Sequence, residues 1–208
     1  YELIENDHVS FKTFQNKNIL LIQPDALKII TENAFYKISH FYRSSHLKLL
    51  RKILDDKEAS KNDHFVALTM LKNANISASG VLPMCQDTGT AIINGYRGKN
   101  IFTDFNEEKE LSRGIYNSYQ KNNLRFSQLA PISMFEEKNT NNNLPGEINL
   151  YAAEGDEYKF TFIQKGGGSA NKSFLYQQTK AILNPKDLKK FLYEIIISLG
   201  TAACPPYH

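Results

Sequence analysis

The sequence predicts an α/β protein of the α+β type, in which a helix-rich N-terminal segment packs on a small, mostly antiparallel or mixed sheet. Three patterns lead to this fold class. Apolar residues recur at helical spacing before Gly80, turn-rich sequence with β-branched and aromatic residues follows it, and apolar and polar residues alternate from Tyr158 onward. With 208 residues, the chain is long enough to bury a core of its own.

The first part of the chain predicts helices. The range Pro24 to Asp56 has apolar residues at helical spacing and is expected to form two consecutive helices. Pro24 suits the first turn of the first helix, and Ser44 or Ser45 is expected to cap the second. Ser60 with Asp63 resembles a capping box at the start of a third helix.

At Gly80 the pattern changes, so we divide the chain into a helical segment, residues 1–79, and a mixed α/β part, residues 80–208. Two short strands are expected at Thr90 to Ile93 and at Ile101 and Phe102, with turns at Asn94-Gly95 and Arg97-Gly98 between them.

A further helix is expected from Glu107 to Leu124, followed by a polar, low-complexity loop from Asn139 to Asn143 to which we assign no function. The clearest strands are Glu147 to Tyr151 and Tyr158 to Gln164, joined by a turn.

Two helices are expected near the end of the chain. One runs from about Ser173 to Leu183, and the other begins at Asn184-Pro185 and ends at Gly200. Together these patterns predict a helical layer on a small sheet.

Composition excludes several classes of protein. The formal net charge is only +3, from 25 basic and 22 acidic residues, which does not suggest a nucleic-acid-binding protein. No apolar run approaches the ~18 residues of a membrane helix, and the start lacks a signal-peptide pattern. The chain begins at Tyr1 without a Met and ends directly after a helical stretch, so we expect it to be part of a longer protein.

The glycine-rich segment Lys165 to Lys172 lies between an expected strand and an expected helix, a context in which main-chain N–H groups hold anions. It fails the P-loop and dinucleotide patterns, because Asn171 stands where each requires a glycine. A sharp turn without function is one interpretation, and a site for a small carboxylate or phosphate is the other.

The second candidate site is the segment Pro83 to Thr90, which places a thiol, an amide, a carboxylate and two hydroxyls close together. Cys85 and Cys204 are the two cysteines, and they are either buried, inert thiols or metal ligands. Two thiolates alone complete neither a zinc site nor a four-iron cluster, so a metal site would need ligands from outside this sequence.

Several ordered blocks resemble class I fumarate hydratases, the oxygen-sensitive [4Fe-4S] type. The resemblance covers about Phe65 to His208 and is carried by the following segments: Leu82 to Thr90, Ser112 to Tyr116, Asn123 to Gln128, Glu136 to Thr140, Asn143 to Pro145, Lys165 to Lys172 and Gly200 to His208.

This resemblance implies a lyase of the tricarboxylic acid cycle that reversibly hydrates fumarate to (S)-malate at a cluster with one open iron. By resemblance, Cys85 and Cys204 are two of three cluster ligands, and the third lies beyond His208. Gln86, Asp87, Arg125 and Gly168 match residues that contact substrate, with Asp87 also expected to act in proton transfer. Turn-capping for Asp87 and a solvated cation for Arg125 are the structural alternatives.

The resemblance further implies that residues 1–208 are an N-terminal domain, that a C-terminal domain completes the active site, and that the whole enzyme is a homodimer in the mitochondrion or, alternatively, the cytosol. The fragment alone is expected to be inactive and without its cluster. A sister dehydratase for tartrate or methylfumarate, and a non-catalytic module that binds an anion or a partner, are the alternative functions.

Overall fold

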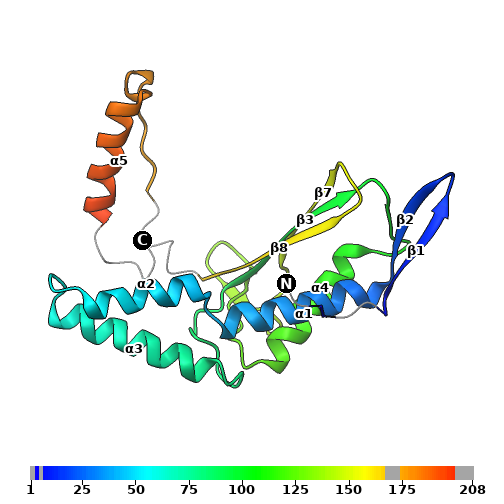
Figure 1. The fold of residues 1–208 in the computed structure, drawn as a ribbon, viewed down its shortest axis with the longest axis horizontal. Helices are drawn as coiled ribbons and strands as arrows, with labels where there is room; N and C mark the ends of the chain where they lie inside the picture. Colours follow the sequence, from blue (N-terminus) through cyan, green and yellow to red (C-terminus); the bar gives the residue numbers. More distant parts are fainter. Residues whose placement is uncertain (1–2, 5–6, 167–173, 200–208) are drawn as a thin grey trace. The chain divides into compact units, whose positions relative to one another are not determined.

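The computed structural model describes residues 3–4, 7–166 and 174–199. The chain divides into two compact units, Tyr1–Lys165 and Gly166–His208, and each is considered by itself. The change of sequence pattern at Gly80 falls inside the first unit, where helices from both sides of it pack together. The chain is an α/β mixture with small sheets, which confirms the predicted fold class (Figure 1).

The first unit opens with a β-hairpin, so the expectation that residues 1–79 are helical is wrong for this part. Strands β1 (Val9–Phe14) and β2 (Lys17–Ile22) pair antiparallel. Gln15 and Asn16 connect them, both with positive φ, as the favoured two-residue turns require. The helical interpretation failed because Gln-Asn is a weaker turn signal than Asn-Gly, and because the apolar residues of β1, Val9, Phe11 and Phe14, do not alternate regularly.

Three helices follow, as the apolar spacing predicts: α1 (Pro24–His40), α2 (Ser44–Asp55) and α3 (Lys61–Ser77). Pro24 occupies the first turn of α1, and the capping box of Ser60 and Asp63 is formed at α3. The predicted serine cap of α2 is wrong, because Arg43 is the N-cap and makes no side-chain capping bond.

The central sheet has the strand order β7-β3-β8 and is mixed. Strand β3 (Thr90–Gly98) pairs parallel with β7 (Glu147–Ala153) and antiparallel with β8 (Tyr158–Lys165). The turn predicted at Asn94-Gly95 is wrong, since β3 continues through it. Gly95 is needed there for space: an added Cβ would lie 2.7 Å from Leu150 Cδ2.

Two smaller sheets complete the first unit. Strand β4 (Ile101–Phe102) pairs parallel with β2, and β5 (Leu129–Pro131) forms a short hairpin with β6 (Glu137–Asn139). The loop predicted from Asn139 to Asn143 therefore begins one residue later.

Helix α4 (Glu107–Lys121) confirms the predicted helix with an earlier end, and it runs beside α1 (Figure 1). The core between these helices and the sheet includes Phe35, whose ring lies 5.8 Å from that of Phe162 and 6.4 Å from that of Tyr119. Gly114 allows the close approach of the two helices, because a Cβ there would lie 2.5 Å from Thr31 Cβ.

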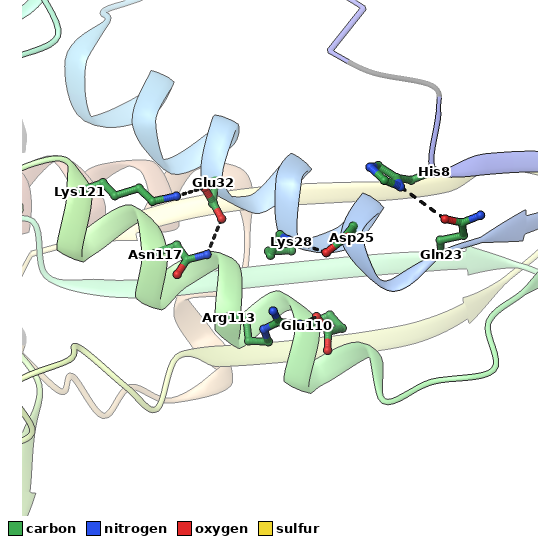
Figure 2. A network of polar contacts seen from close by, with 9 residues as sticks. All are labelled: His8, Gln23, Asp25, Lys28, Glu32, Glu110, Arg113, Asn117 and Lys121. Carbon is green, nitrogen blue, oxygen red and sulfur yellow. Dashed lines mark hydrogen bonds and ion pairs between the residues drawn. The ribbon is translucent and has the colours of Figure 1, made fainter.

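Charged and polar side chains cover the outer side of the α1–α4 pair. Figure 2 shows Glu32 of α1 accepting from Lys121 and Asn117 of α4 at 3.0 and 2.6 Å. The other contacts drawn, such as Glu110–Arg113, lie within one helix or beside it. These partly exposed pairs mark the solvent side of the interface.

In the second unit, the described residues comprise the short 3₁₀ helix η2 (Lys180–Ile182) and helix α5 (Pro185–Leu199). The helix predicted from Ser173 to Leu183 is wrong over its described part, where only η2 is helical. The start of α5 is as predicted, with Asn184 Oδ1 accepting from the Asp187 N–H at 3.0 Å. Its predicted end at Gly200 lies outside the described residues. Among the described helices, none combines the length and apolar composition that crossing a bilayer requires.

Candidate functional site

Three segments of the first unit meet at one edge of the central sheet. Thr90, the first residue of β3, pairs with Lys165, the last residue of β8. Strand β7 runs parallel to β3 and begins at Glu147, opposite Ile92. The loop before β3 (residues 81–89, the cysteine loop) and the segment before β7 (residues 140–146, the asparagine segment) therefore enter the sheet at the edge where β8 leaves it.

The cysteine loop is fixed to two helices through its main chain. The Met84 N–H donates to Ser39 O of α1 at 2.8 Å, and Met84 O accepts from Asn73 Nδ2 of α3 at 2.6 Å. Asn123 Nδ2 donates to Val81 O at 2.9 Å. Since these bonds satisfy main-chain groups that have no strand or helix partner, the loop is held directly before Cys85.

A second loop lies against the cysteine loop. Residues 122–128 (the arginine loop) follow α4 and carry Arg125. The hydroxyl of Thr88, which is 3% exposed, donates to Arg125 O at 2.9 Å. One hydrogen bond therefore joins the residue after Asp87 to the main chain of Arg125.

The buried side chain of Tyr119 holds the end of the cysteine loop at Thr88 and Gly89. Its hydroxyl donates to Thr88 O at 2.6 Å and lies 3.2 Å from Gly89 O, and it accepts from Gln164 Nε2 at 3.2 Å. Burial raises the pKa of Tyr119 to about 12. The phenol therefore stays protonated at neutral pH and remains a donor to the cysteine loop.

Asn143 joins the two loops with one side chain. It is fully buried, donates from Nδ2 to Gly89 O at 2.9 Å, and accepts at Oδ1 from the N–H groups of Ser127 and Gln128 at 2.7 and 3.2 Å. Asn139 adds a bond from Nδ2 to Phe126 O at 2.8 Å. Sequence reasoning missed both asparagines by assigning their polar run no function, although Asn143 also stands in one of the family-like blocks.

The predicted site residues of the cysteine loop lie at its surface. Cys85 is exposed and unpaired with another cysteine, and the Asp87 N–H points to its Sγ at 3.4 Å. Gln86 is exposed and Asp87 is half-buried. Arg125 is exposed on the neighbouring loop. The structure thus brings together the two loops that carry these four residues, while Cys204 and Gly168 lie outside the described residues.

The donor set at this edge is incomplete for a metal ion. Within the described ranges, no group of three or more His, Cys, Asp or Glu side chains is placed to hold one. Cys85 offers one soft ligand, and the Asp87 N–H is directed at its sulfur. Gln86 and Asp87 follow it in the loop, and Arg125 on the adjoining loop carries a guanidinium, the group that pairs best with a small carboxylate or phosphate.

An apolar cavity of the first unit lies away from these loops. It measures about 200 Å³ and is lined by the hairpin, α1 and β8, including Leu20, Ile22, Leu27 and Phe160. Its lining carries none of the predicted site residues, so it belongs to the packing of the hairpin rather than to the candidate site.

The chain is similar to a known family of proteins. Residues 29–208 match the family model described as fumarate hydratase (Fumerase). The whole chain is 56% identical to fumarate hydratase 1, mitochondrial, of Leishmania major and 52% identical to the aerobic class I fumarate hydratase of Escherichia coli K12. It spans 38% of the length of each.

A more distant relative comes from Methanocaldococcus jannaschii and carries the name of an L(+)-tartrate dehydratase alpha subunit. It is 30% identical over 159 residues, which cover 72% of this chain and 54% of the relative.

Proposed function

Since this chain belongs to the class I fumarate hydratase family, we propose that it is the N-terminal domain of a lyase that reversibly hydrates fumarate to (S)-malate. The observation that carries the proposal is the junction of the cysteine and arginine loops, where Thr88 Oγ1 donates to Arg125 O at 2.9 Å. This bond holds the residues proposed to act on the substrate next to the proposed cluster ligand.

The proposed cofactor is a [4Fe-4S] cluster, with Cys85 as one ligand and Cys204 as another. An exposed thiol on an anchored loop, with an N–H directed at its sulfur, suits a cluster ligand. When bound, the cluster supplies a Lewis acid for the substrate hydroxyl and a carboxylate. The third cysteine belongs to the part of the protein beyond this chain.

The remaining roles follow from the chemistry of each side chain. Arg125 offers a planar two-pronged guanidinium that pairs with one carboxylate of the dianion. Gln86 donates or accepts a hydrogen bond beside it, and Asp87 both contacts the substrate and holds or gives up a proton. Gly168, in the glycine-rich segment, is proposed to contribute a main-chain contact to the substrate.

Completion of the site is also a proposal. The chain spans about two fifths of the length of its curated relatives, so a C-terminal domain supplies the other acid–base and carboxylate-binding groups, and the 208 residues alone are inactive.

We place the whole enzyme in the mitochondrion as a homodimer. The similarity to a mitochondrial relative and to a bacterial one is nearly equal, so the cytosol is the alternative, and imaging of a tagged complete protein decides between them.

The test uses the complete protein, reconstituted with iron and sulfide without oxygen. Fumarate consumption is followed by absorbance in the wild type, in Cys85→Ser and in Arg125→Ala, with Arg51→Ala as the control for removal of an exposed arginine. We expect turnover to disappear in Cys85→Ser and the KM for fumarate to rise at least about tenfold in Arg125→Ala, as loss of a charge-assisted bond predicts. Unchanged turnover in Cys85→Ser contradicts the proposed ligand.

A dehydratase for tartrate or methylfumarate is the second candidate, and the similarity to the M. jannaschii protein favours its consideration. A substrate panel separates the two: a kcat/KM for tartrate well above that for fumarate contradicts our choice. If the complete protein forms no cluster and turns over no member of the panel, a non-catalytic binding module is the correct interpretation.

A further inference from the structure

The two loops at the sheet edge have no backbone ladder to set their spacing. Between α3 and β3, and between α4 and β5, the described residues form no regular strand or helix. Their relative position therefore depends on side chains that bond to main-chain groups of both loops. Asn143 does this from inside the protein, with an exposed fraction of 0%.

Both ends of the Asn143 amide are used. Nδ2 reaches Gly89 O, two residues after Asp87, and Oδ1 reaches the N–H groups of Ser127 and Gln128, two and three residues after Arg125. We propose that Asn143 is a positioning residue that sets the spacing between Asp87 on the cysteine loop and Arg125 on the arginine loop. The proposal rests on the function proposed above and adds a residue that touches no substrate.

Asparagine is the side chain that meets all conditions at this place. The backbone has φ of 57°, a left-handed conformation that asparagine adopts more readily than other side chains. Aspartate keeps the acceptor for Ser127 and Gln128 but has no N–H for Gly89 O. Alanine removes both ends, so the N–H groups of Ser127 and Gln128 lose their acceptor and Gly89 O keeps only the Tyr119 hydroxyl at 3.2 Å.

Loss of the bond between Asn143 and Gly89 O is expected to weaken substrate binding, because it changes the spacing between the two loops. If the Gly89 end is released while the Ser127 end is kept, the cysteine loop shifts relative to Arg125. A carboxylate held by Arg125 then no longer meets Gln86 and Asp87 in register, and small displacements of this kind reduce catalysis strongly. Loss of global stability alone leaves KM unchanged at temperatures well below Tm.

The experiment compares Asn143→Asp with the wild type in the complete, reconstituted protein, well below the measured Tm of each. Asn149→Asp is the control, because its half-buried side-chain amide bonds to Asn94 and Glu147 within the sheet and to neither loop. We expect KM for fumarate to rise between about tenfold and a hundredfold in Asn143→Asp. Iron per protein and the KM of the control are expected to stay at wild-type values.

A second readout needs no turnover. In the complete protein without its cluster, hydrogen exchange at the Ser127 and Gln128 amides is expected to accelerate in Asn143→Ala and to stay slow in Asn143→Asp, which keeps the acceptor. If the wild type fails to hydrate fumarate while this exchange pattern is found, the proposed function is wrong and the link between the loops stands.

If Asn143→Asp does not fold, Thr88→Val tests the same spacing from the other loop. This nearly isosteric change removes the bond to Arg125 O and is expected to raise KM in the same direction. A KM within twofold of wild type in the folded variant, or an equal rise in Asn149→Asp, overturns the proposal.

Discussion

The pair of helices α1 and α4 and the pair of loops at the sheet edge are held together in opposite ways. Within each helix, hydrogen bonds pair the main-chain N–H and C=O groups, and the two helices are held together by close packing, with Gly114 against Thr31. Their cross-helix charges lie on the solvent side (Figure 2). The loops satisfy few main-chain groups themselves and depend on the buried side chains of Tyr119 and Asn143.

This difference shows where the sequence tolerates change. A closely packed helix interface loses stability when a substitution adds volume to it. Loss of an exposed charged side chain changes its stability very little. The loop pair fails when one buried donor or acceptor is removed, because the partner is then left without water or protein to bond. Three measurements on the 208-residue chain test this difference between the two regions.

The largest effect is expected from Gly114→Ala. The added Cβ would lie 2.5 Å from Thr31 Cβ and 2.7 Å from Lys28 O, so α1 and α4 must move apart. Overpacking against groups that cannot rotate away is expected to lower the free energy of unfolding by about 3 kcal/mol, measured by urea denaturation. Gln120→Ala, on the exposed side of α4, serves as control and should change it by less than about 0.5 kcal/mol. An unchanged free energy of unfolding in Gly114→Ala would show that close packing at Gly114 does not hold the two helices together.

The next effect concerns Tyr119 and alkaline pH. Burial raises its pKa from 10.0 to about 12, so the folded state favours the neutral phenol. The stability that it contributes is fully present below pH 10 and is lost as pH rises to 12, by about 2 to 3 kcal/mol at ~1.4 kcal/mol per pH unit.

Urea denaturation of the wild type and of Tyr119→Phe between pH 8 and 12 measures this loss. At pH 8 the variant should be less stable by about 1 to 2 kcal/mol, because Thr88 O loses its donor. The difference should shrink and reverse toward pH 12. Burial also raises the pKa of Tyr158, but this group is present in both proteins. Parallel pH profiles would contradict the role of the Tyr119 phenol.

The smallest effect is expected from Lys121→Ala. This removes the ion pair with Glu32 across α1 and α4, whose lysine side chain is 64% exposed. Exposed pairs contribute little, so the free energy of unfolding should change by less than about 0.5 kcal/mol and the change should vanish in 1 M salt. A loss above 1 kcal/mol would mean that surface charge, and not shape, holds the helices together.

Much of the regular structure was predictable from the sequence. Helical spacing identified α1, α2, α3 and α4, and alternation identified β7 and β8, because these signals are local. The Gln15-Asn16 turn and the course of β3 through Gly95 were missed. The turn was missed because Gln-Asn is a weak local signal, and the course of β3 was missed because its deciding partner lies elsewhere in the chain, where Leu150 fills the space beside Gly95.

The candidate site was predictable only in part. The thiol, amide, carboxylate and guanidinium were selected from residue type and family resemblance, and their roles stay predictions. The buried supports were not selected, since Tyr119 looks like an ordinary core residue and Asn143 like part of a polar loop. Their importance depends on contacts with residues 31 and 54 positions away, for Thr88 and Gly89 respectively.

That separation has a consequence for synthesis on the ribosome. Gly89 leaves the ribosome 54 residues ahead of Asn143, and its strand must then wait for β7 and β8 to complete the sheet. At roughly 5 to 20 residues per second, about 4 to 15 s pass between the synthesis of Gly89 and that of Lys165, the last residue of β8. During that interval the loop that carries Cys85 lacks the support of Asn143 and of the complete sheet, so its thiol is open to oxidants before the loop is fully fixed.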